Sequence, residues 1–382
     1  MNIAFIYAKG RRNRYAETVQ GLAATEFFYG ALELEQRGHV ITHCELGHGD
    51  ITKFWHKVAD KLYRWRMLPT RTSGVILAEL HDMCPSLNKA DVIVATTTAA
   101  AFGLSTLKLF GFVHSPIVAI HCGIANYQLA WLRRKLNAIS LKHMWTQLFG
   151  EGELQIVQKF YGVPDSRIEV NQFGVDIGFW KPDDAEGDYI LAVWNDERRD
   201  YELLVQVARG VNEKFKIVTR RQIKNDIPSN VEIIKGGWHE QALTDEDLRV
   251  LYQQAKVVVI PLINSPQPSG QSVCLQAMAC GKSVVLTWTD GLWSQAMMRG
   301  NDNVTFVPPG NEKALLNAIK QLVRNSGQRK KIGTCAPKTA CIEGNITAFA
   351  ERLETLGHRV YEAGNKTTKS FLKYYIVLWI YL

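Results

Sequence analysis

The sequence lacks the features of a secreted, disulfide-bonded or metal-binding protein. Its seven cysteines are odd in number and scattered, with neither CxxC spacing nor the ligand spacing of Cys/His sites. Neither a zinc site nor a disulfide framework is therefore supported, and no metal or cofactor is expected. The first residues are apolar, with no basic segment before them and no cleavage site after them, so no signal peptide is expected. These absences favour a reducing, cytoplasmic setting.

Long apolar runs and nucleic-acid motifs are also absent. The apolar tail Tyr374–Leu382 is too short to cross a bilayer, which takes about 20 residues. The net charge of +8 and the pI of about 9.0 favour an anionic partner, such as a nucleotide diphosphate, an acidic polysaccharide or a membrane surface. Nucleic acid fits this charge too, but no motif supports it, so none is expected.

The chain does contain short apolar strands that alternate with helices. Residues 2–7 predict a first strand, and a basic loop at 9–14 follows it. A helix from about Thr25 to Gln36 is expected to stop at Gly38, because glycine commonly follows the last helical residue. Further strands, short and uninterrupted as in a parallel sheet buried on both faces, are expected at 40–42, 91–95 and 115–120.

A second series of the same kind begins near Asp188. Its expected strands are 189–193, 215–218, 231–234, 257–260, 283–286 and 305–307. The helices expected between them include 201–208, 246–254 and 312–323. Strands alternating with helices predict an α/β protein with two doubly wound, Rossmann-like domains. The boundary is placed within residues 179–187, so that the domains span 1–180 and 181–330, and ligands are expected in the cleft between them.

The segment 261–285 is the richest in functional signals. It predicts a strand, a loop of Pro, Ser and Gly, a helix over about Val273–Ala279, and another strand. A loop of small residues that enters a helix directs unpaired backbone N–H groups at one point, which suits an anion. The expected cradle is made of Ser269, Gly270, Gln271 and Ser272. An ordinary surface loop before a capped helix would have the same composition.

Several segments, in order, resemble the group 1 (family 4-like) glycosyltransferases of the GT-B fold. The family's Glu-Ala-Met-Ala-x-Gly-Lys-Pro-Val-Val corresponds here to residues 276–285. The other similar segments are 173–176 with 179–180, 251–261, and 307–311. The resemblance covers residues 1–325. It implies an acceptor-binding N-terminal domain, a donor-binding C-terminal domain, and a helical segment 331–382 that packs back towards the first domain.

The resemblance also assigns residues, with one departure. The family's second motif glutamate, which bonds the donor ribose, corresponds to Gln276, and its first glutamate corresponds to Pro268. An amide still donates and accepts hydrogen bonds, but the negative charge is lost. Arg199, with Arg198 beside it, stands where a basic pair clamps the diphosphate. The resemblance gives Gly21 a phosphate contact and His121 a contact with the donor sugar. Purely structural roles are equally suited to Arg198, Arg199, Gly21 and His121.

The implied activity is metal-independent transfer of a sugar, with retention, from a nucleotide-diphosphate sugar to a glycan or lipid-linked acceptor. Since the loop has no carboxylate nucleophile, a substrate-assisted, front-face reaction is the hypothesis. An epimerase or a phosphorylase on this architecture is the alternative enzyme, but the expected acid/base carboxylates or cofactor lysine are not visible. The missing glutamates motivate another alternative, a non-catalytic, membrane-associated protein that binds sugar nucleotides.

Residues Lys53–Arg66 predict a basic helix with apolar residues on one face. Phe54, Val58, Leu62 and Trp65 share that face. Such a helix suits an anionic membrane surface, and a location on the inner face of the membrane follows from this interpretation. The same stripe equally suits packing against the protein's own core.

Overall fold

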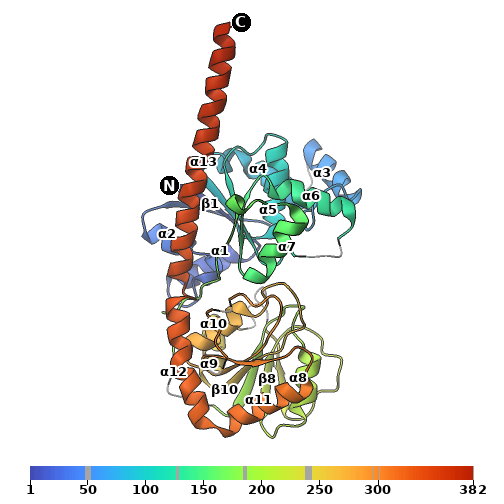
Figure 1. Cartoon of the computed structure of the whole chain (residues 1–382), viewed down its shortest axis with the longest axis vertical. Coiled ribbons are helices and arrows are strands. Elements are labelled where there is room, and N and C mark those ends of the chain that lie inside the picture. Colours follow the sequence, from blue (N-terminus) through green and yellow to red (C-terminus); the bar gives the residue numbers. More distant parts are fainter. Residues whose placement is uncertain are drawn as a thin grey trace.

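The computed structural model describes residues 1–47, 53–125, 129–183, 187–236, 243–294, 296–300 and 302–381; the side chains of Trp55 and of residues beyond 364 lie outside this description. Two α/β lobes are stacked one above the other, and a long C-terminal helix runs along the first (Figure 1). The prediction of a GT-B-like arrangement of two doubly wound domains is confirmed.

The N-lobe is built on a six-stranded parallel sheet with the order β2-β1-β3-β4-β5-β6. Its strands are β1 (Asn2–Tyr7), β2 (Val40–Glu45), β3 (Val92–Ala95), β4 (Ile117–His121), β5 (Trp145–Leu148) and β6 (Ile168–Val170). Its helices are α1 (Arg11–Val19), α2 (Ala31–Gln36), α3 (Phe54–Arg64), α4 (Gly74–Leu87), α5 (Thr98–Leu109), α6 (Trp131–Leu141) and α7 (Glu151–Tyr161), with short 3₁₀ turns at Glu26–Phe28 and Asp165–Arg167.

The C-lobe repeats this plan with the strand order β12-β11-β10-β7-β8-β9. Its strands are β7 (Tyr189–Val193), β8 (Lys214–Val218), β9 (Val231–Ile234), β10 (Ala255–Ile260), β11 (Val284–Thr287) and β12 (Thr305–Val307). Its helices are α8 (Tyr201–Ala208), α9 (Asp245–Gln253), α10 (Gln271–Ala279), α11 (Glu312–Arg324) and α12 (Ser326–Ile342). Helix α13 (Ile346–Tyr381) follows.

Two local predictions in the N-lobe are wrong. The basic loop expected at 9–14 is instead the start of α1, which begins at Arg11 after Gly10 adopts a φ of 100°. The single helix expected over Thr25–Gln36 is broken into the 3₁₀ turn and α2, because Tyr29 and Gly30 take φ values of 53° and 79°. All the strands expected from the sequence are present, with ends shifted by a few residues.

The N-lobe and C-lobe are joined through residues 171–188 and again through the α12–α13 junction. Val175 pairs with Asn345, and the backbone N–H of Ile346 donates to the carbonyl of Val175. Gly174 lies so close to Asn345 that a Cβ atom would overlap its backbone. Helix α12 packs against α10 in the C-lobe, whereas α13 contacts α2, β3 and β4 of the N-lobe (Figure 1).

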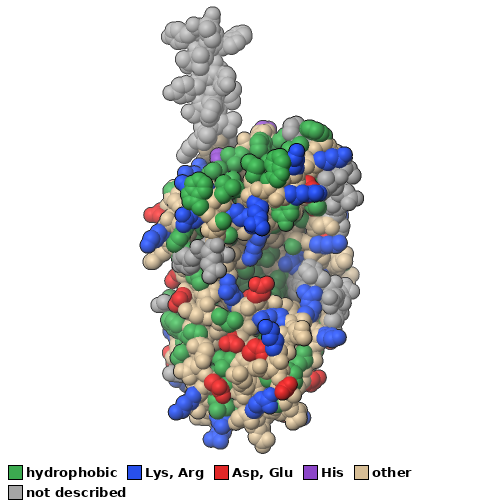
Figure 2. Space-filling view, turned by 90° about the vertical axis from the view of Figure 1, so that its right-hand side faces the viewer, with side chains coloured by type: hydrophobic (Ala, Val, Ile, Leu, Met, Phe, Trp, Pro, Cys, Tyr) green, Lys and Arg blue, Asp and Glu red, His purple; other side chains and the backbone are tan. Residues whose placement is uncertain are grey.

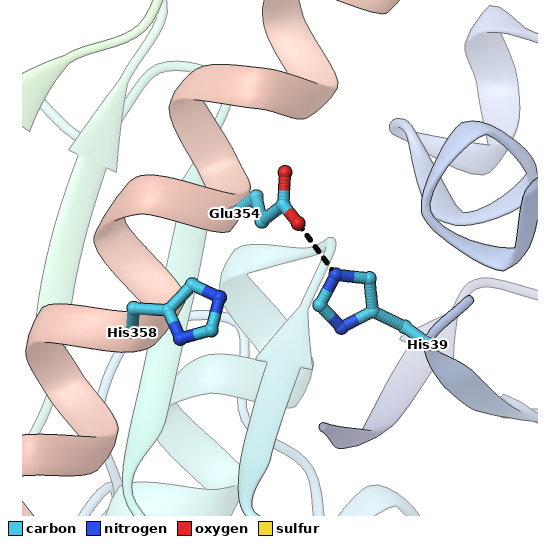
Figure 3. A group of neighbouring side chains, drawn as sticks. All are labelled: His39, Glu354 and His358. Atoms are coloured by element: carbon cyan, nitrogen blue, oxygen red, sulfur yellow. Dashed lines mark hydrogen bonds and ion pairs between the residues drawn. The ribbon is translucent and has the colours of Figure 1, made fainter. Parts of the chain in front are cut away.

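Polar contacts fix α13 to the turn between α2 and β2 (Figure 3). The ring of His39 donates from Nε2 to Glu354 Oε1 (2.7 Å), and Arg37 Nε donates to Glu354 Oε2 (2.8 Å). His358, one turn further along α13, lies beside the same imidazole. None of the described helices is both long and apolar enough to cross a membrane.

Replacing Glu354 with Ala is expected to destabilise the protein by about 1 to 3 kcal/mol, because two charge-assisted hydrogen bonds are lost at a largely buried carboxylate. The matched control is Glu351→Ala, whose side chain is 53% exposed and meets Arg37 at 3.3 Å. Its loss is expected to cost about 0 to 1 kcal/mol. Unfolding in guanidinium measures both; equal losses would show that Glu354 does not hold α13.

Candidate donor site between the lobes

The strand order of the C-lobe defines where a ligand is expected. If the six strands are numbered by their order along the chain, they lie in the sheet as 6-5-4-1-2-3. The direction of winding therefore reverses between β7 and β10. Ligands of such sheets bind beyond the carboxyl ends of the strands at this reversal. Two segments lie there, Trp194–Arg199 after β7 and Pro261–Gly270 after β10. They pair with each other, since Arg199 forms an antiparallel bridge with Leu262.

The N-terminus of α10 is open at this point. Gly270 occupies the N-cap position with a φ of 87°, and among the described residues no side-chain cap accepts from the first N–H groups of the helix. The other C-lobe helices described, α8, α9, α11 and α12, each begin with a side-chain cap. Helix α10 starts at Gln271, two residues earlier than expected, so Gln271 and Ser272 present their N–H groups in its first turn. This geometry suits a bound anion.

Arg199 brings a positive charge to the same place. Its side chain is buried, with Nε donating to the carbonyl of Val193 (3.2 Å) and Nη1 donating to Ser269 Oγ (3.3 Å). A Cβ atom on Gly270 would lie 3.3 Å from Nη1, so the guanidinium sits directly at the start of α10. Within the described ranges, no carboxylate forms an ion pair with Arg199. A buried charge without a counter-ion is costly, and an anionic ligand would offset that cost.

The structure separates Arg199 from its neighbour Arg198. Arg198 is half-buried, and its backbone N–H donates to Asp196 Oδ1 (2.9 Å), but no described contact joins its side chain to the cradle. Arg221 lies closer, because its Nη1 donates to the carbonyls of Asp196 (3.0 Å) and Arg199 (2.6 Å). Arg221 therefore holds the backbone that carries Arg199. The role predicted for Arg198 stays a prediction.

A cavity of about 280 Å³ lies beside the cradle. It opens at the carboxyl ends of β7, β8 and β9 and at the first turn of α9, where Trp194, Val218 and Leu243 form apolar walls. Asp196 lines this cavity and also accepts a hydrogen bond from Ser269 Oγ, so the cavity and the cradle are adjacent. Phe27 of the N-lobe stacks on Trp194 with ring centres 6.2 Å apart. Apart from the strand ends, no sequence pattern indicates this cavity.

Gln276 is placed deeper than the sequence suggests. It lies on the second turn of α10 with 1% of its surface exposed, and its Nε2 donates to Glu26 Oε1 (2.9 Å). Its Oε1 accepts from the hydroxyl of Tyr252 (3.2 Å). Both ends of the amide are therefore bonded within the protein. The predicted ribose contact requires at least one of these bonds to be exchanged, and it stays a prediction.

Glu26 is a buried carboxyl group that sequence reasoning missed. Besides Gln276, it accepts from Trp180 Nε1 (2.7 Å) and from the backbone N–H of Asp176 (3.1 Å). Burial raises the pKa of Glu26 to about 8, because the loss of hydration outweighs these N–H donors. A carboxyl group from the N-lobe thus faces position 276, where the resemblance implies a motif glutamate in the family. Only the tertiary structure brings the two positions together.

His121 lies at the carboxyl end of β4, fully buried. Its Nδ1 shares a hydrogen bond with Thr98 Oγ1 (3.2 Å), while Nε2 has no partner among the described atoms. Burial, and then the nearby charge of Arg71, lowers the pKa of His121 to about 3, so the ring is neutral at pH 7. The neutral imidazole thus has one ring nitrogen that is enclosed in the protein and has no partner among the described atoms.

Glu153 supports the loop that follows His121. Its Oε1 accepts from the backbone N–H groups of Ile124 and Ala125, both at 2.8 Å. Burial raises its pKa to about 7 despite these bonds. The loop meets the C-lobe directly, since a Cβ atom on Gly123 would lie 2.9 Å from Cδ of Gln267. Glu153 therefore positions the N-lobe side of the cleft.

Gly21 is not brought close to the other residues of the candidate donor site. It lies in the turn after α1 with a φ of 74°, exposed, and no atom comes within 4 Å of a Cβ built on it. The positive φ is sufficient reason for a glycine here. Its predicted phosphate contact stays a prediction. The adjoining segment does reach the C-lobe, because Ala24 N–H donates to Asp245 Oδ2 (3.1 Å) and Arg14 pairs with Asp245 at 2.5 Å.

Ligand-type side chains that are distant in sequence also come together elsewhere. His39, Glu354 and His358 form one group (Figure 3), and His56, His81 and Asp82 form another. In each group, atoms able to bind a metal lie within 4.8 Å of one another. Sequence spacing cannot reveal such groups, and neither of these two contains a residue of the cradle or its cavity.

Comparison with known proteins supports the fold. Residues 191–325 match the family model described as glycosyl transferases group 1. No curated protein gives a significant match. Among solved structures, sucrose-phosphate synthase from Thermosynechococcus elongatus is 15% identical, with 95% of this chain and 100% of that chain covered and a TM-score of 0.69.

Two further structures show the same fold. A glycosyltransferase from Rickettsia africae is 14% identical over 94% of this chain and 98% of that chain, with a TM-score of 0.66. HepE of Anabaena, in complex with UDP-glucose, is 15% identical over 94% of this chain and 100% of that chain, with a TM-score of 0.65. At these identities the likeness establishes the fold.

Replacing Glu26 with Gln is expected to change how stability depends on pH. Because its pKa is raised on folding, Glu26 contributes stability that is fully present below its unfolded pKa and is lost as pH rises towards about 8. This loss amounts to at most roughly 1.4 kcal/mol per pH unit. The variant should therefore match the wild type near pH 4 and exceed it above pH 8.

Denaturant unfolding at several pH values measures this difference, with the exposed Glu312→Gln as control. Glu153 contributes with the same sign over a lower range and is unchanged in both variants. Parallel pH profiles for the wild type and Glu26→Gln would mean that Glu26 is ionised in the folded protein.

Proposed function

We propose that this chain transfers a sugar from a nucleotide-diphosphate sugar to a hydroxyl group of a saccharide or lipid-linked acceptor. The match of residues 191–325 to the family model described as glycosyl transferases group 1 supports this proposal. The observation that carries the proposal is the buried guanidinium of Arg199 at the uncapped start of α10. A donor diphosphate would supply the missing negative charge and accept from the N–H groups of Gln271 and Ser272.

The neighbouring cavity provides space for the nucleoside. At about 280 Å³ it lies near the lower end of the range of small-ligand sites, roughly 300 to 1,000 Å³. Its apolar walls suit the faces of a base, and the polar groups of Asn195, Asp196 and Thr244 suit its edges or a ribose. The solved complex of HepE with UDP-glucose, which shares the fold, supports a donor of this class.

The proposed reaction depends on stabilising the negative charge that develops on the departing diphosphate. As the bond from the anomeric carbon to the β-phosphate oxygen breaks, negative charge builds on the diphosphate, where Arg199 and the start of α10 stabilise it by preorganised electrostatics. The acceptor oxygen bonds to the same face of the anomeric carbon, and its proton passes to the departing phosphate oxygen. The sugar is therefore retained in configuration, without a protein nucleophile and without a metal.

His121 is proposed to contact the donor sugar rather than to transfer a proton. A ring whose pKa is about 3 stays neutral through the working pH range, so it acts as a hydrogen-bonding group. Its unpartnered Nε2 is the atom that would meet a sugar hydroxyl. Glu153 holds the adjoining loop in place, and a cytoplasmic setting remains part of the proposal.

A catalytically inactive sugar-nucleotide-binding protein is the second candidate. It is favoured by one observation, the engagement of Gln276 with Glu26 and Tyr252 in place of an open motif glutamate. Hydrolysis of the donor in the absence of acceptor separates the two: an enzyme releases free sugar slowly, whereas a binding protein leaves the donor intact.

A panel of UDP, GDP, ADP and CMP is expected to reveal the base. A ligand that binds only the native state raises its stability by about 2.7 kcal/mol at a free concentration one hundred times Kd. One nucleotide should therefore raise the thermal midpoint well above the others. No shift with any of the four would contradict donor binding.

Arg199→Ala is expected to lower kcat by about 10²- to 10³-fold, because a preorganised donor to the leaving group is lost. Arg199→Lys keeps the charge without the paired N–H geometry and should fall between the alanine variant and the wild type. Arg198→Ala is the matched control and should change kcat by less than about tenfold. Circular dichroism checks folding, and equal losses for Arg198 and Arg199 would contradict the assignment.

A further inference from the structure

A second cavity lies in the N-lobe, and the proposed transfer reaction does not use it. It measures about 370 Å³ and lies between α3, α4 and the end of α5. Its walls are almost wholly apolar and include Ala59, Leu62, Leu77, Leu107, Phe110 and Phe112. Its volume is within the range of small-ligand sites, roughly 300 to 1,000 Å³, so it has room for a flexible apolar group.

The packing of α3 accounts for this space. The two helices α3 and α4 touch where Gly74 meets Asp60, and a Cβ atom at Gly74 would overlap the backbone of Asp60. The apolar face of α3 is not fully covered, however. Val58 and Leu62 are only half-buried, and Phe110, at the edge of the cavity, is 66% exposed. The apolar face of α3, which on sequence grounds suits either the protein's core or a membrane surface, is thus partly exposed to solvent.

The face of α3 next to this apolar face is positively charged. Residues 53–66 contain five Lys and Arg residues and one acidic residue, Asp60, which pairs with Arg64. Lys57 and Lys61 are exposed on this face, and Lys61 Nζ lies 4.7 Å from the ring centre of Trp65. Lys53 is already bonded to Asp82. Two lysines beside an apolar cavity are complementary to a molecule with an anionic head and an apolar chain.

Large apolar side chains are exposed around the same end of the N-lobe. Figure 2, which views the molecule from the side of α3 and α6, shows apolar and basic side chains together at the end of the N-lobe far from the C-lobe. Phe54 and Trp65, at the two ends of α3, are 72% and 59% exposed. Aromatic and basic side chains in one surface are typical of proteins that lie in a bilayer interface.

We propose that this cavity binds an acyl chain of an anionic glycerophospholipid, and that the surrounding surface docks the N-lobe on an anionic membrane. The chain lies among Ala59, Leu62 and Leu107, while Lys57 and Lys61 face the headgroups. The hydrophobic effect favours the chain in the cavity, and the anionic surface attracts the lysines. The site is independent of the donor cradle, so it goes beyond the proposed transferase activity.

The first experiment titrates the full-length protein with a dansyl-labelled fatty acid, without nucleotide sugar. Saturable binding is expected for the wild type. Ala59→Phe and Val58→Phe, which fill the cavity from α3, should each weaken binding by at least about tenfold. Ile139→Phe adds a ring to an exposed residue of α6 outside the cavity and should bind like the wild type.

The second experiment uses sedimentation with vesicles of phosphatidylcholine, with or without phosphatidylglycerol. The wild type should bind more tightly when phosphatidylglycerol is present. The double variant Lys57→Gln/Lys61→Gln should lose this difference but still bind the dansyl fatty acid. Circular dichroism and the nucleotide-induced thermal shift confirm that each variant is folded.

Unchanged fatty-acid binding in both cavity-filling variants would overturn the proposal, as would equal binding to the two kinds of vesicle. Because neither assay contains a donor or an acceptor, these outcomes leave the proposed transferase function untouched. Conversely, a protein that binds lipid but no nucleotide would contradict the transferase proposal and support this one.

Discussion

The arrangement of the candidate site depends on one buried charge. Arg199 lies at the reversal point of the C-lobe sheet, bonded to a carbonyl and a hydroxyl rather than to a carboxylate. Removing a guanidinium from water is unfavourable unless an anion or several acceptors replace the lost hydration. The open start of α10 adds the positive end of a helix dipole at the same place. Together they make this point electropositive, which suits a bound anion.

The second constraint is the contact between the lobes. Glu26 of the N-lobe meets Trp180, Gln276 and the backbone of Asp176 in a region closed to solvent. A glutamate at position 276 would place two carboxyl groups against each other, so the glutamine and the raised pKa of Glu26 are mutually consistent. The pairing of Arg14 with Asp245 adds a second polar contact between the lobes.

The sequence predicted the fold well because strands buried on both faces are continuous apolar runs. It predicted the loop and the helix α10 that follows it, because small residues before a helical pattern are a local signal, whereas the binding of an anion there stays a prediction. It did not predict that the expected helix is broken at Tyr29 and Gly30, because the break depends on the positive φ angles of these two residues. Nor could it reveal the partners of Gln276, since Glu26 is 250 residues away in the chain. The sequence likewise could not show that Arg199 reaches the cradle and Arg198 does not, because this depends on the direction of each side chain.

The most direct test of the account is a crystal structure of the protein with an intact nucleotide-diphosphate sugar. The account predicts the β-phosphate within hydrogen-bonding distance of Arg199 and the first N–H groups of α10, with the base in the cavity beside Trp194. A donor bound elsewhere, or a guanidinium of Arg199 that makes no contact with the diphosphate when the donor is in place, would contradict it.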